Sequence, residues 1–364
     1  MSYIDTIKEL CALSGVSGWE EPVTAYITER LESQGFERAA AGTQPEQWLQ
    51  NSYDIDPMGN LTVFKTGASA PKKRLMLAAH MDEVGLIVTD ITEDGYLRFD
   101  FVGGVDRRVI IGKRVLVGDS AIPGVIGICP IHLTDKSAAS DIPKLERLLI
   151  DIGVRDRESA AALVNLGDRA IFDGFVTEFG SGLLKAKAID DRLGCAVLLE
   201  LLASELPVDC YFAFTVQEEV GTRGATVAAY RVKPDVALVV EGTTAADLPG
   251  VETGKKICRL GEGAVVPFMD RGTVYDRGLY EFVTRLAERR DIPWQTKSVV
   301  AGGTDAGIIH RSGKGVRTIG IAAGIRNIHS PASIASINDM ESVLELAFAF
   351  LEEYEDYTDG VLEG

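Results

Sequence analysis

Two adjacent glutamates, Glu218 and Glu219, follow the largely apolar run at residues 211–216 after one intervening residue, Gln217. Ligands in open α/β sheets bind outside the carboxyl ends of the strands. Two acids placed there without a neighbouring lysine need a cation or a proton to be stable. An isolated Glu-Glu pair is more often the solvated start of a loop. Similar residues follow other strands of this chain, and that recurrence favours a functional site.

Other residues of metal-binding type occupy corresponding positions along the chain. They are His80 and Asp82 after the apolar run 75–79, Glu241 after the run 234–240, His329 after the strand expected at 316–323, and Asp190 before an apolar helix. Two imidazoles and several carboxylates, without cysteine, suit zinc, cobalt or manganese. A single ion rarely needs so many anionic ligands. The pattern therefore predicts two divalent ions about 3.5 Å apart, bridged by one aspartate.

Such a pair of ions would hold a bridging water and convert it to hydroxide near neutral pH, for attack on a carbonyl. One carboxylate must then stay off the metals, to take the proton and pass it to the leaving amine. Alternation along a strand would point Glu218 and Glu219 in different directions and so divide these roles. Asp82 is placed to accept the second ring N–H of His80. Of Asp190 and Asp191, one is expected to cap the following helix and the other to face the site.

The order of the elements predicts an α/β fold with a doubly wound mixed sheet, in which the strand ends converge on one rim. Short alternating segments separated by glycines indicate an inserted, small β-barrel-like domain. The expected division is residues 1–90 and 178–364 for the catalytic domain and 91–177 for the insertion. Within the insertion, residues 144–150 and 157–165 are expected to form short helices.

Two further local predictions concern the ends of the chain. Residues 39–53 show weak periodicity and are expected to form a loop or an irregular hairpin. The last helix is expected to begin at a capping box formed by Asn338 and Glu341.

Composition limits the possible partners. The chain has 364 residues, 46% hydrophobic content and a formal charge of −17, which argues against nucleic acid and anionic membranes as partners. Five scattered cysteines without a CxxC pair fit a reducing cytoplasm. Apolar runs are too short to span a bilayer, and the first ten residues resemble an amphipathic helix rather than a signal peptide. We therefore expect a cytoplasmic protein that does not bind membranes.

Five motifs, taken in order, resemble those of the glutamyl aminopeptidase family, also called tetrahedral aminopeptidases, some members of which carry an endoglucanase label. The motifs are HMDEVG at 80–85, AIDDRLG at 188–194, QEEVGTRGA at 217–225, GGTD at 302–305 and IHS at 328–330. The resemblance extends over nearly the whole chain. It implies a phosphorylase/hydrolase-like fold of the zinc-exopeptidase type and an aminopeptidase that uses two zinc or cobalt ions to shorten peptides.

The resemblance also implies a role for each site residue. Asp190 matches the bridging ligand. His80 and Glu241 match the other ligands of one metal, and Glu219 and His329 those of the second. Glu218 matches the general base, and Asp82 matches the partner of the histidine. The inserted domain is used in the family for dimerisation, and six dimers form a hollow tetrahedral particle, so a homo-oligomer between dimer and dodecamer is expected.

The chain departs from the family in two places, and rival functions remain open. The family more often has aspartate where this chain has Glu241, and the segment 44–53 is longer than usual. A deacylase of N-acyl amino acids could use the same metals but would need an arginine for the free carboxylate, and Arg192, Arg223 and Arg326 are candidates. A glycoside hydrolase needs no histidine pair and would use more aromatic residues. The sequence shows no basic pocket that would favour acidic peptides.

Overall fold

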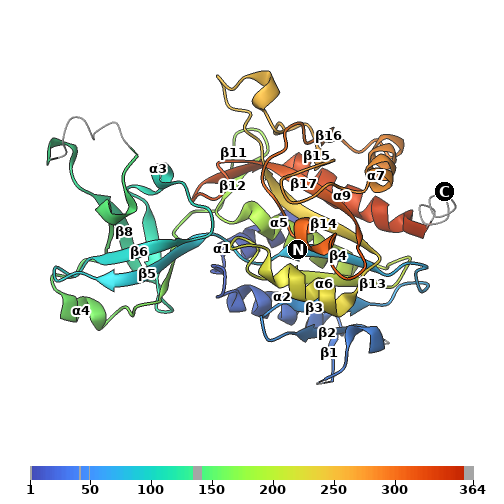
Figure 1. The fold of residues 1–364 in the computed structure, drawn as a ribbon, viewed down its shortest axis with the longest axis horizontal. Helices are drawn as coiled ribbons and strands as arrows, with labels where there is room; N and C mark the ends of the chain where they lie inside the picture. Colours follow the sequence, from blue (N-terminus) through green and yellow to red (C-terminus); the bar gives the residue numbers. More distant parts are fainter. Residues whose placement is uncertain (1, 41, 49, 134–141, 356–364) are drawn as a thin grey trace.

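The computed structural model describes residues 2–40, 42–48, 50–133 and 142–355. It confirms the α/β class, with one large mixed sheet of twelve strands and a separate closed barrel (Figure 1). In spatial order the main strands are β1 (Glu37–Arg38), β2 (Ser52–Ile55), β3 (Leu61–Lys65), β13 (Cys210–Thr215), β4 (Leu75–His80), β14 (Val236–Thr244), β17 (Arg317–Arg326), β18 (Ser333–Ser336), β12 (Leu183–Ala186) and β11 (Thr177–Phe179). β15 (Ala264–Val266) pairs with β17 and with β16 (Trp294–Thr296).

The four central strands, β13, β4, β14 and β17, are parallel to one another. Their carboxyl ends therefore lie at the same edge of the sheet, which is the condition for distant residues to meet there. β3 runs antiparallel to β13, so the sheet as a whole is mixed.

Seven α-helices belong to this part of the described chain. They are α1 (Tyr3–Ala12), α2 (Glu21–Ser33), α5 (Ile189–Ala203), α6 (Arg223–Val232), α7 (Arg277–Arg289), α8 (Ala306–Ile309) and α9 (Ile337–Glu352). α5 packs on β4 and β14 beside α1 and α9, whereas α6 and α8 pack together and contact β13 and β14 respectively. All helices in the described residues are too short or too polar to cross a bilayer.

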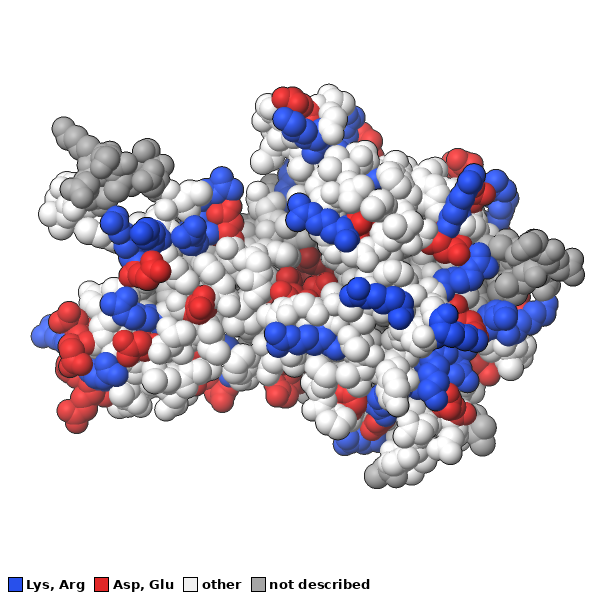
Figure 2. Space-filling view, viewed as in Figure 1, with Lys and Arg blue, Asp and Glu red and all other residues white. Residues whose placement is uncertain are grey.

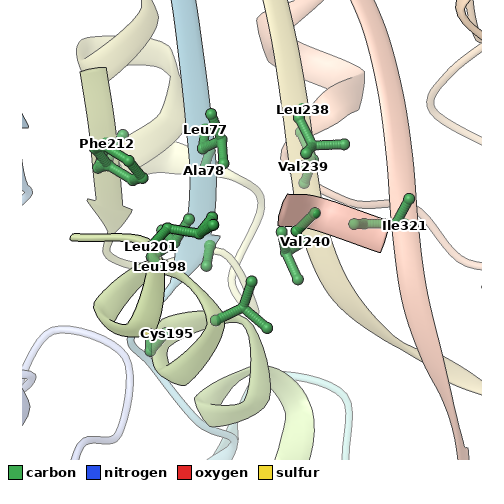
Figure 3. Packing of buried hydrophobic residues seen from close by; sticks show 14 of the residues in the cluster. Leu77, Ala78, Cys195, Leu198, Leu201, Phe212, Leu238, Val239, Val240 and Ile321 are labelled. Carbon is green, nitrogen blue, oxygen red and sulfur yellow. The ribbon is translucent and has the colours of Figure 1, made fainter. Parts of the chain in front are cut away.

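The core lies between α5 and the central strands (Figure 3). Leu77 on β4, Phe212 on β13 and Leu238 on β14 are fully buried, as are Cys195 and Leu198 on α5. The strands are apolar on both sides, as expected for parallel strands covered by helices. This packing holds the strand ends rigidly and so fixes the side chains that follow them.

The barrel forms a second lobe beside the sheet (Figure 1). It closes in the order β10 (Arg169–Phe172), β5 (Gly85–Ile91), β6 (Leu97–Val102), β9 (Leu148–Asp151), β8 (Ile122–Ile128) and β7 (Arg114–Val117). Two short helices, α3 (Arg107–Ile110) and α4 (Arg157–Ala161), accompany it. The barrel has its own buried cluster, which includes Leu86, Leu97, Ile126 and Ile150. Its first strand begins before residue 91, and the domain boundaries given above remain a prediction.

Two local predictions inside the barrel differ from the structure. Residues 144–150 are not an α-helix: a short 3₁₀ turn at Leu145–Arg147 leads into β9. β9 pairs with both β6 and β8, so closure of the barrel outweighs local helix preference. The helix expected over 157–165 forms as α4 but already ends at Ala161.

Of the two local predictions near the chain ends, the first is confirmed in its loop form and the second is wrong. Apart from a 3₁₀ turn at Pro45–Gln47, the described residues between β1 and β2 form a loop, and the two strands pair in parallel at the sheet edge rather than as a hairpin. α9 is capped by Ser336, whose hydroxyl accepts the N–H of Asp339, and not by Asn338. The chain reverses at the end of β18, so the cap comes from the last residue of that strand.

Candidate metal centre

The predicted site residues converge at the carboxyl edge of the parallel strands. His80 is the last residue of β4, Glu218 and Glu219 follow β13, and His329 follows β17. Glu241 does not end its strand as expected, because β14 continues to Thr244 alongside β17. The pairing of β14 with β4 ends at Val239 opposite Ala78, and the same register places Glu241 level with His80, the last residue of β4.

Asp190 lies between the two histidines. Its Oδ1 is 3.4 Å from His80 Nε2, and its Oδ2 is 3.4 Å from His329 Nε2. Each oxygen of one carboxylate therefore faces a different imidazole. Gly242 allows this approach, because a Cβ at that position would lie 2.8 Å from Asp190 Oδ1.

Each histidine has a second carboxylate beside it. His80 Nε2 lies 3.1 Å from Glu241 Oε1, and His329 Nε2 lies 3.2 Å from Glu219 Oε1. The arrangement consists of two His/Glu pairs that share Asp190. By distance, His80 pairs with Glu241 and His329 pairs with Glu219.

The chemistry of these groups fits a cation. Asp190 Oδ1 and Glu241 Oε2 are buried and receive no hydrogen bond from any described residue. Buried carboxylate oxygens without donors carry a large desolvation cost unless a positive charge lies next to them. The oxygens and imidazole nitrogens together offer the ligand types that divalent transition metals take.

Asp191 also lies close to His80 and Glu241, but its two oxygens are already engaged. Oδ1 accepts the N–H of Gly194 at 2.9 Å, and Oδ2 accepts the N–H of His80 at 3.3 Å. A Cβ at position 194 would lie 2.3 Å from Asp191 Oδ2, so the cap requires glycine there. Asp191 therefore caps the regular part of α5 and leaves Asp190 to the site, as the sequence suggested for one of the two.

Asp82 is fully buried and connects three parts of the site. Its Oδ1 lies 3.3 Å from His80 Nδ1 and accepts the N–H of Glu218 at 2.9 Å. Its Oδ2 accepts the N–H of Glu219 at 3.1 Å and the hydroxyl of Ser17 at 2.6 Å. The main-chain oxygen of Asp82 is also 3.1 Å from His80 Nδ1. These donors lower the pKa of Asp82 although burial raises it.

Glu218 and Glu219 face different partners, but strand alternation is not the reason. β13 ends at Thr215, and Gln217 has a positive φ of 56°, so the two glutamates lie in a turn beyond the strand. Glu219 contacts His329, whereas the Glu218 carboxylate makes no hydrogen bond or ion pair with a described residue. Burial raises the pKa of Glu218 well above its usual value, and Glu241, Asp305 and Glu219 raise it further.

The carboxylates stabilise positive charge at both histidines. Burial lowers the pKa of His329, but Asp190 and Glu219 raise it to about 11. The pKa of His80 is likewise raised well above its usual value by Glu241, Asp190 and Asp82, against the effect of burial. A pocket that holds protons this strongly at two imidazoles has a strongly negative potential, as a cation site requires.

Three contributions to the site were not predicted from the sequence. The carbonyl of Gly104, in the loop after barrel strand β6, lies 2.9 Å from His329 Nδ1. Glu20 Oε1 accepts the N–H of Gln217 at 3.1 Å, and Ser17 bonds Asp82. None of these residues lies near a motif, and a main-chain carbonyl leaves no trace in the sequence.

The site lies where the barrel meets the sheet. Figure 2 shows Asp and Glu side chains gathered in the recess between the two lobes. A loop from the barrel thus borders a site whose other parts belong to the main sheet.

The chain is similar to several curated aminopeptidases. It is 35% identical over 344 residues to a putative aminopeptidase of Acetivibrio thermocellus, covering 94% of this chain and 96% of that protein. It is 33% identical to the glutamyl aminopeptidase of Lactococcus lactis, covering 93% of each. It is also 33% identical to the lysyl aminopeptidase of Pyrococcus furiosus, covering 96% of each.

Solved structures share the fold. An aminopeptidase of Desulfurococcus kamchatkensis matches with a TM-score of 0.89 and 34% identity, covering 99% of this chain and 97% of that one. A protein of Thermotoga maritima described as an endoglucanase matches with a TM-score of 0.77 and 34% identity, covering 97% and 98%. The TET1 peptidase of Pyrococcus horikoshii, described as assembling into a tetrahedron or a large octahedral shell, matches with a TM-score of 0.80 and 32% identity, covering 96% and 99%.

The family described as M42 glutamyl aminopeptidase matches residues 59–346, a range that contains all the site residues predicted from the sequence. Together with these relatives along almost the whole chain, the match shows that the protein belongs to the M42 glutamyl aminopeptidase family.

Proposed function

We propose that the protein is a metal-dependent aminopeptidase that removes N-terminal residues from short peptides. The observation that carries the proposal is the Asp190 carboxylate, which directs one oxygen toward each of two His/Glu pairs. Such an arrangement suits a two-metal hydrolytic site. The names of the relatives support the exopeptidase reaction.

His80, Glu241 and Asp190 would hold one divalent ion, and Glu219, His329 and Asp190 the other. Zinc, cobalt or manganese bound there would polarise the scissile carbonyl and lower the pKa of a bound water toward neutrality. Glu241 stands where aspartate is more usual in the family, and its Oε1 already lies 3.1 Å from His80 Nε2. Its carboxylate is therefore close enough to His80 to share an ion with it.

Glu218 is proposed as the general base. It lies beside the ligand Glu219 but contacts neither histidine, so its carboxylate is free to take a proton from the attacking water. Because burial and neighbouring acids raise its pKa, Glu218 can keep that proton and then donate it to the leaving amine. Asp82 is proposed as a positioning residue that orients the His80 ring and holds the backbone of both glutamates.

The deacylase alternative receives less support from the structure. Arg192 is fully buried against Leu10 and Glu83, and Arg326 forms a bidentate pair with Asp247. Arg223 Nη1 points at Gln217 Oε1, 3.5 Å away. Two of the three arginines are thus engaged elsewhere, and a glycosidase would make no use of the paired histidines.

We also propose a cytoplasmic homo-oligomer, between dimer and dodecamer, in which residues 91–177 provide the dimer contact. Support comes from the TET1 relative and from apolar side chains exposed on the barrel lobe, including Val125, Leu163 and Leu166. Exposed apolar groups of this kind often mark contacts between subunits. The net charge of −17 continues to argue against nucleic-acid and membrane partners.

The test is hydrolysis by enzyme stripped with a chelator and then resupplied with zinc, cobalt or manganese separately. We expect metal-dependent release of p-nitroaniline from leucyl- or glutamyl-p-nitroanilide, with no action on carboxymethylcellulose. Release of amino acid from N-acetyl amino acids, without action on the anilides, would favour the deacylase and contradict the proposal.

A further inference from the structure

Glu20 is a buried carboxylate that does not serve the helix on which it lies. It occupies the N-cap of α2, and only 5% of the residue is exposed. Its side chain makes no capping hydrogen bond to α2, although such a bond is the usual reason for a polar residue at an N-cap. Burial raises the pKa of Glu20 to about 7, so a charged group is unfavourable at this position by itself. Helix capping therefore does not explain Glu20.

The carboxylate of Glu20 instead connects two loops. Its Oε1 accepts the N–H of Gly18 at 2.8 Å and the N–H of Gln217 at 3.1 Å. Gly18 belongs to the segment that leads into α2, whereas Gln217 directly precedes the proposed base Glu218. Because one oxygen makes both bonds, the position of this atom ties the N-terminal segment to the turn that carries the base.

The turn at residues 216–219 depends on side chains from other segments. Each of its four consecutive N–H groups donates to such a side chain: Val216 to Asn60, Gln217 to Glu20, and Glu218 and Glu219 to Asp82. Gln217 also has a φ of 56°, which residues other than glycine rarely adopt. An acceptor that holds the N–H of Gln217 therefore stabilises the least favourable conformation of the turn.

Glu20 differs from Asp82 in what it contacts. Asp82 also lies 3.3 Å from His80 Nδ1, so a change there reaches a metal ligand directly. The carboxylate of Glu20 accepts its hydrogen bonds from Gly18 and Gln217 and forms no ion pair within the described chain. A change at Glu20 therefore acts on the turn and leaves the contacts of both histidines in place.

We propose that Glu20 is a positioning residue for the base: by holding the N–H of Gln217, it fixes the backbone from which the Glu218 carboxylate reaches the attacking water. This inference rests on the proposed aminopeptidase function and deepens it. A general base must lie within hydrogen-bond distance of the proton that it takes, and a displacement of about 1 Å can lower turnover about 100-fold. Loss of the bond from Gln217 frees its backbone to leave the positive-φ conformation, and this moves the next residue.

Two other roles of Glu20 predict different results. If Glu20 only ties α2 to the sheet, its replacement should lower stability and leave the turnover of the folded enzyme unchanged. If its negative charge is what matters, a shorter acid should function and a neutral amide should not. The positioning role predicts the reverse, because it needs an acceptor at the right distance rather than a charge.

The experiment compares the wild type with Glu20→Gln and Glu20→Asp, each stripped of metal and resupplied with zinc. Glutamine keeps the length of the side chain, and because both donors face Oε1, the amide can turn its oxygen toward them. Aspartate keeps the charge and is a preferred N-cap, but it withdraws the acceptor by one methylene group. Glu21→Asp is the matched control, because it makes the same change at the neighbouring exposed position.

Three quantities are measured for each protein. Bound zinc is determined by elemental analysis, and kcat and KM are determined with leucyl-p-nitroanilide. Hydrogen exchange of the peptic fragment that contains residues 216–219, followed by mass spectrometry, reports on the turn without any turnover.

We expect Glu20→Asp to lose about 10- to 100-fold in kcat, with bound zinc and KM close to those of the wild type. Glu20→Gln should lose less than about fivefold, which is the difference between a charged and a neutral acceptor, and Glu21→Asp should match the wild type. Exchange in the fragment should be faster in Glu20→Asp and close to the wild type in Glu20→Gln.

Three results would overturn the inference. They are a kcat within about twofold of the wild type in Glu20→Asp, a kcat as low in Glu20→Gln as in Glu20→Asp, and a loss of zinc in Glu20→Asp as large as its loss of kcat. A wild type that hydrolyses no aminoacyl anilide would instead contradict the aminopeptidase function. The exchange data still test Glu20 in that case, because equal exchange in the wild type and Glu20→Asp would show that Glu20 does not hold the turn.

Discussion

Both carboxylate oxygens of Asp82 accept hydrogen bonds, and replacing Asp82 by asparagine turns one of these acceptors into a donor. Both oxygens face main-chain donors that cannot move away, Glu218 N–H at 2.9 Å on Oδ1 and Glu219 N–H at 3.1 Å on Oδ2. Whichever way the amide turns, its NH₂ group must face one of these N–H groups. The Asp82→Asn variant therefore loses one of these two hydrogen bonds completely. The other hydrogen bond remains but is no longer made to a charged acceptor.

The expected size of the effect follows from these contacts. A buried hydrogen bond to a charged group contributes about 1.5–3 kcal/mol, so the variant should lose roughly 2–4 kcal/mol of folding stability. The ring of His80 also loses its charged partner at 3.3 Å. Loss of such a partner lowers metal affinity or activity about 10- to 100-fold.

The assay combines metal titration, followed by thermal unfolding, with kcat/KM on an aminoacyl-p-nitroanilide. Ser17→Ala is the matched control, because it removes the 2.6 Å bond to Asp82 Oδ2 and leaves the carboxylate and both N–H groups in place. It should change metal affinity by less than Asp82→Asn does. An Asp82→Asn protein with metal affinity and kcat/KM within about twofold of the wild type would refute this reasoning.

Three further predictions concern the base, the barrel loop and an ion pair at the start of α7. Glu218→Gln should keep its metal, measured by elemental analysis, and lose about 10²- to 10⁴-fold in kcat, whereas Glu219→Gln should lose metal. Turnover near the wild-type rate in Glu218→Gln would exclude Glu218 as the base. Gly103→Ala should weaken metal binding, measured by titration. The reason is that Gly103 has a φ of +84° and that the added Cβ would lie 2.8 Å from Val84 and 3.2 Å from Glu219. An unchanged metal affinity would show that the barrel loop does not support the site. Asp276→Asn keeps the cap of α7 but breaks the 2.8 and 2.9 Å pair with Arg317, and should cost about 1–2 kcal/mol at pH 7 in chemical unfolding. Burial raises the pKa of Asp276, but the pKa is lowered overall from 3.8, chiefly by Arg317. The stability difference between wild type and variant should therefore persist above about pH 4 and disappear as the pH falls further. A stability difference independent of pH would contradict the assignment.

The sequence was sufficient for the chemistry of the site. Short apolar runs that precede His80, Glu218 and Glu241 predicted parallel strands, because strands buried on both faces have that length and composition. Parallel strands deliver their ends to one edge, so convergence of these side chains followed from topology alone. The sequence also predicted that one of Asp190 and Asp191 caps the helix and the other faces the site, since aspartate before an apolar helix is a preferred cap. It did not predict which of the two has which role.

Only the tertiary structure decided how these groups are paired. Residues 148–151 form β9 because they pair with β6 and β8, and these strands lie twenty or more residues earlier in the sequence. The contact between the carbonyl of Gly104 and His329 is invisible in the sequence for a related reason. A hydrogen bond, or the lack of one, depends on distances of a few tenths of an ångström between segments, and those distances are fixed only when the whole core has packed.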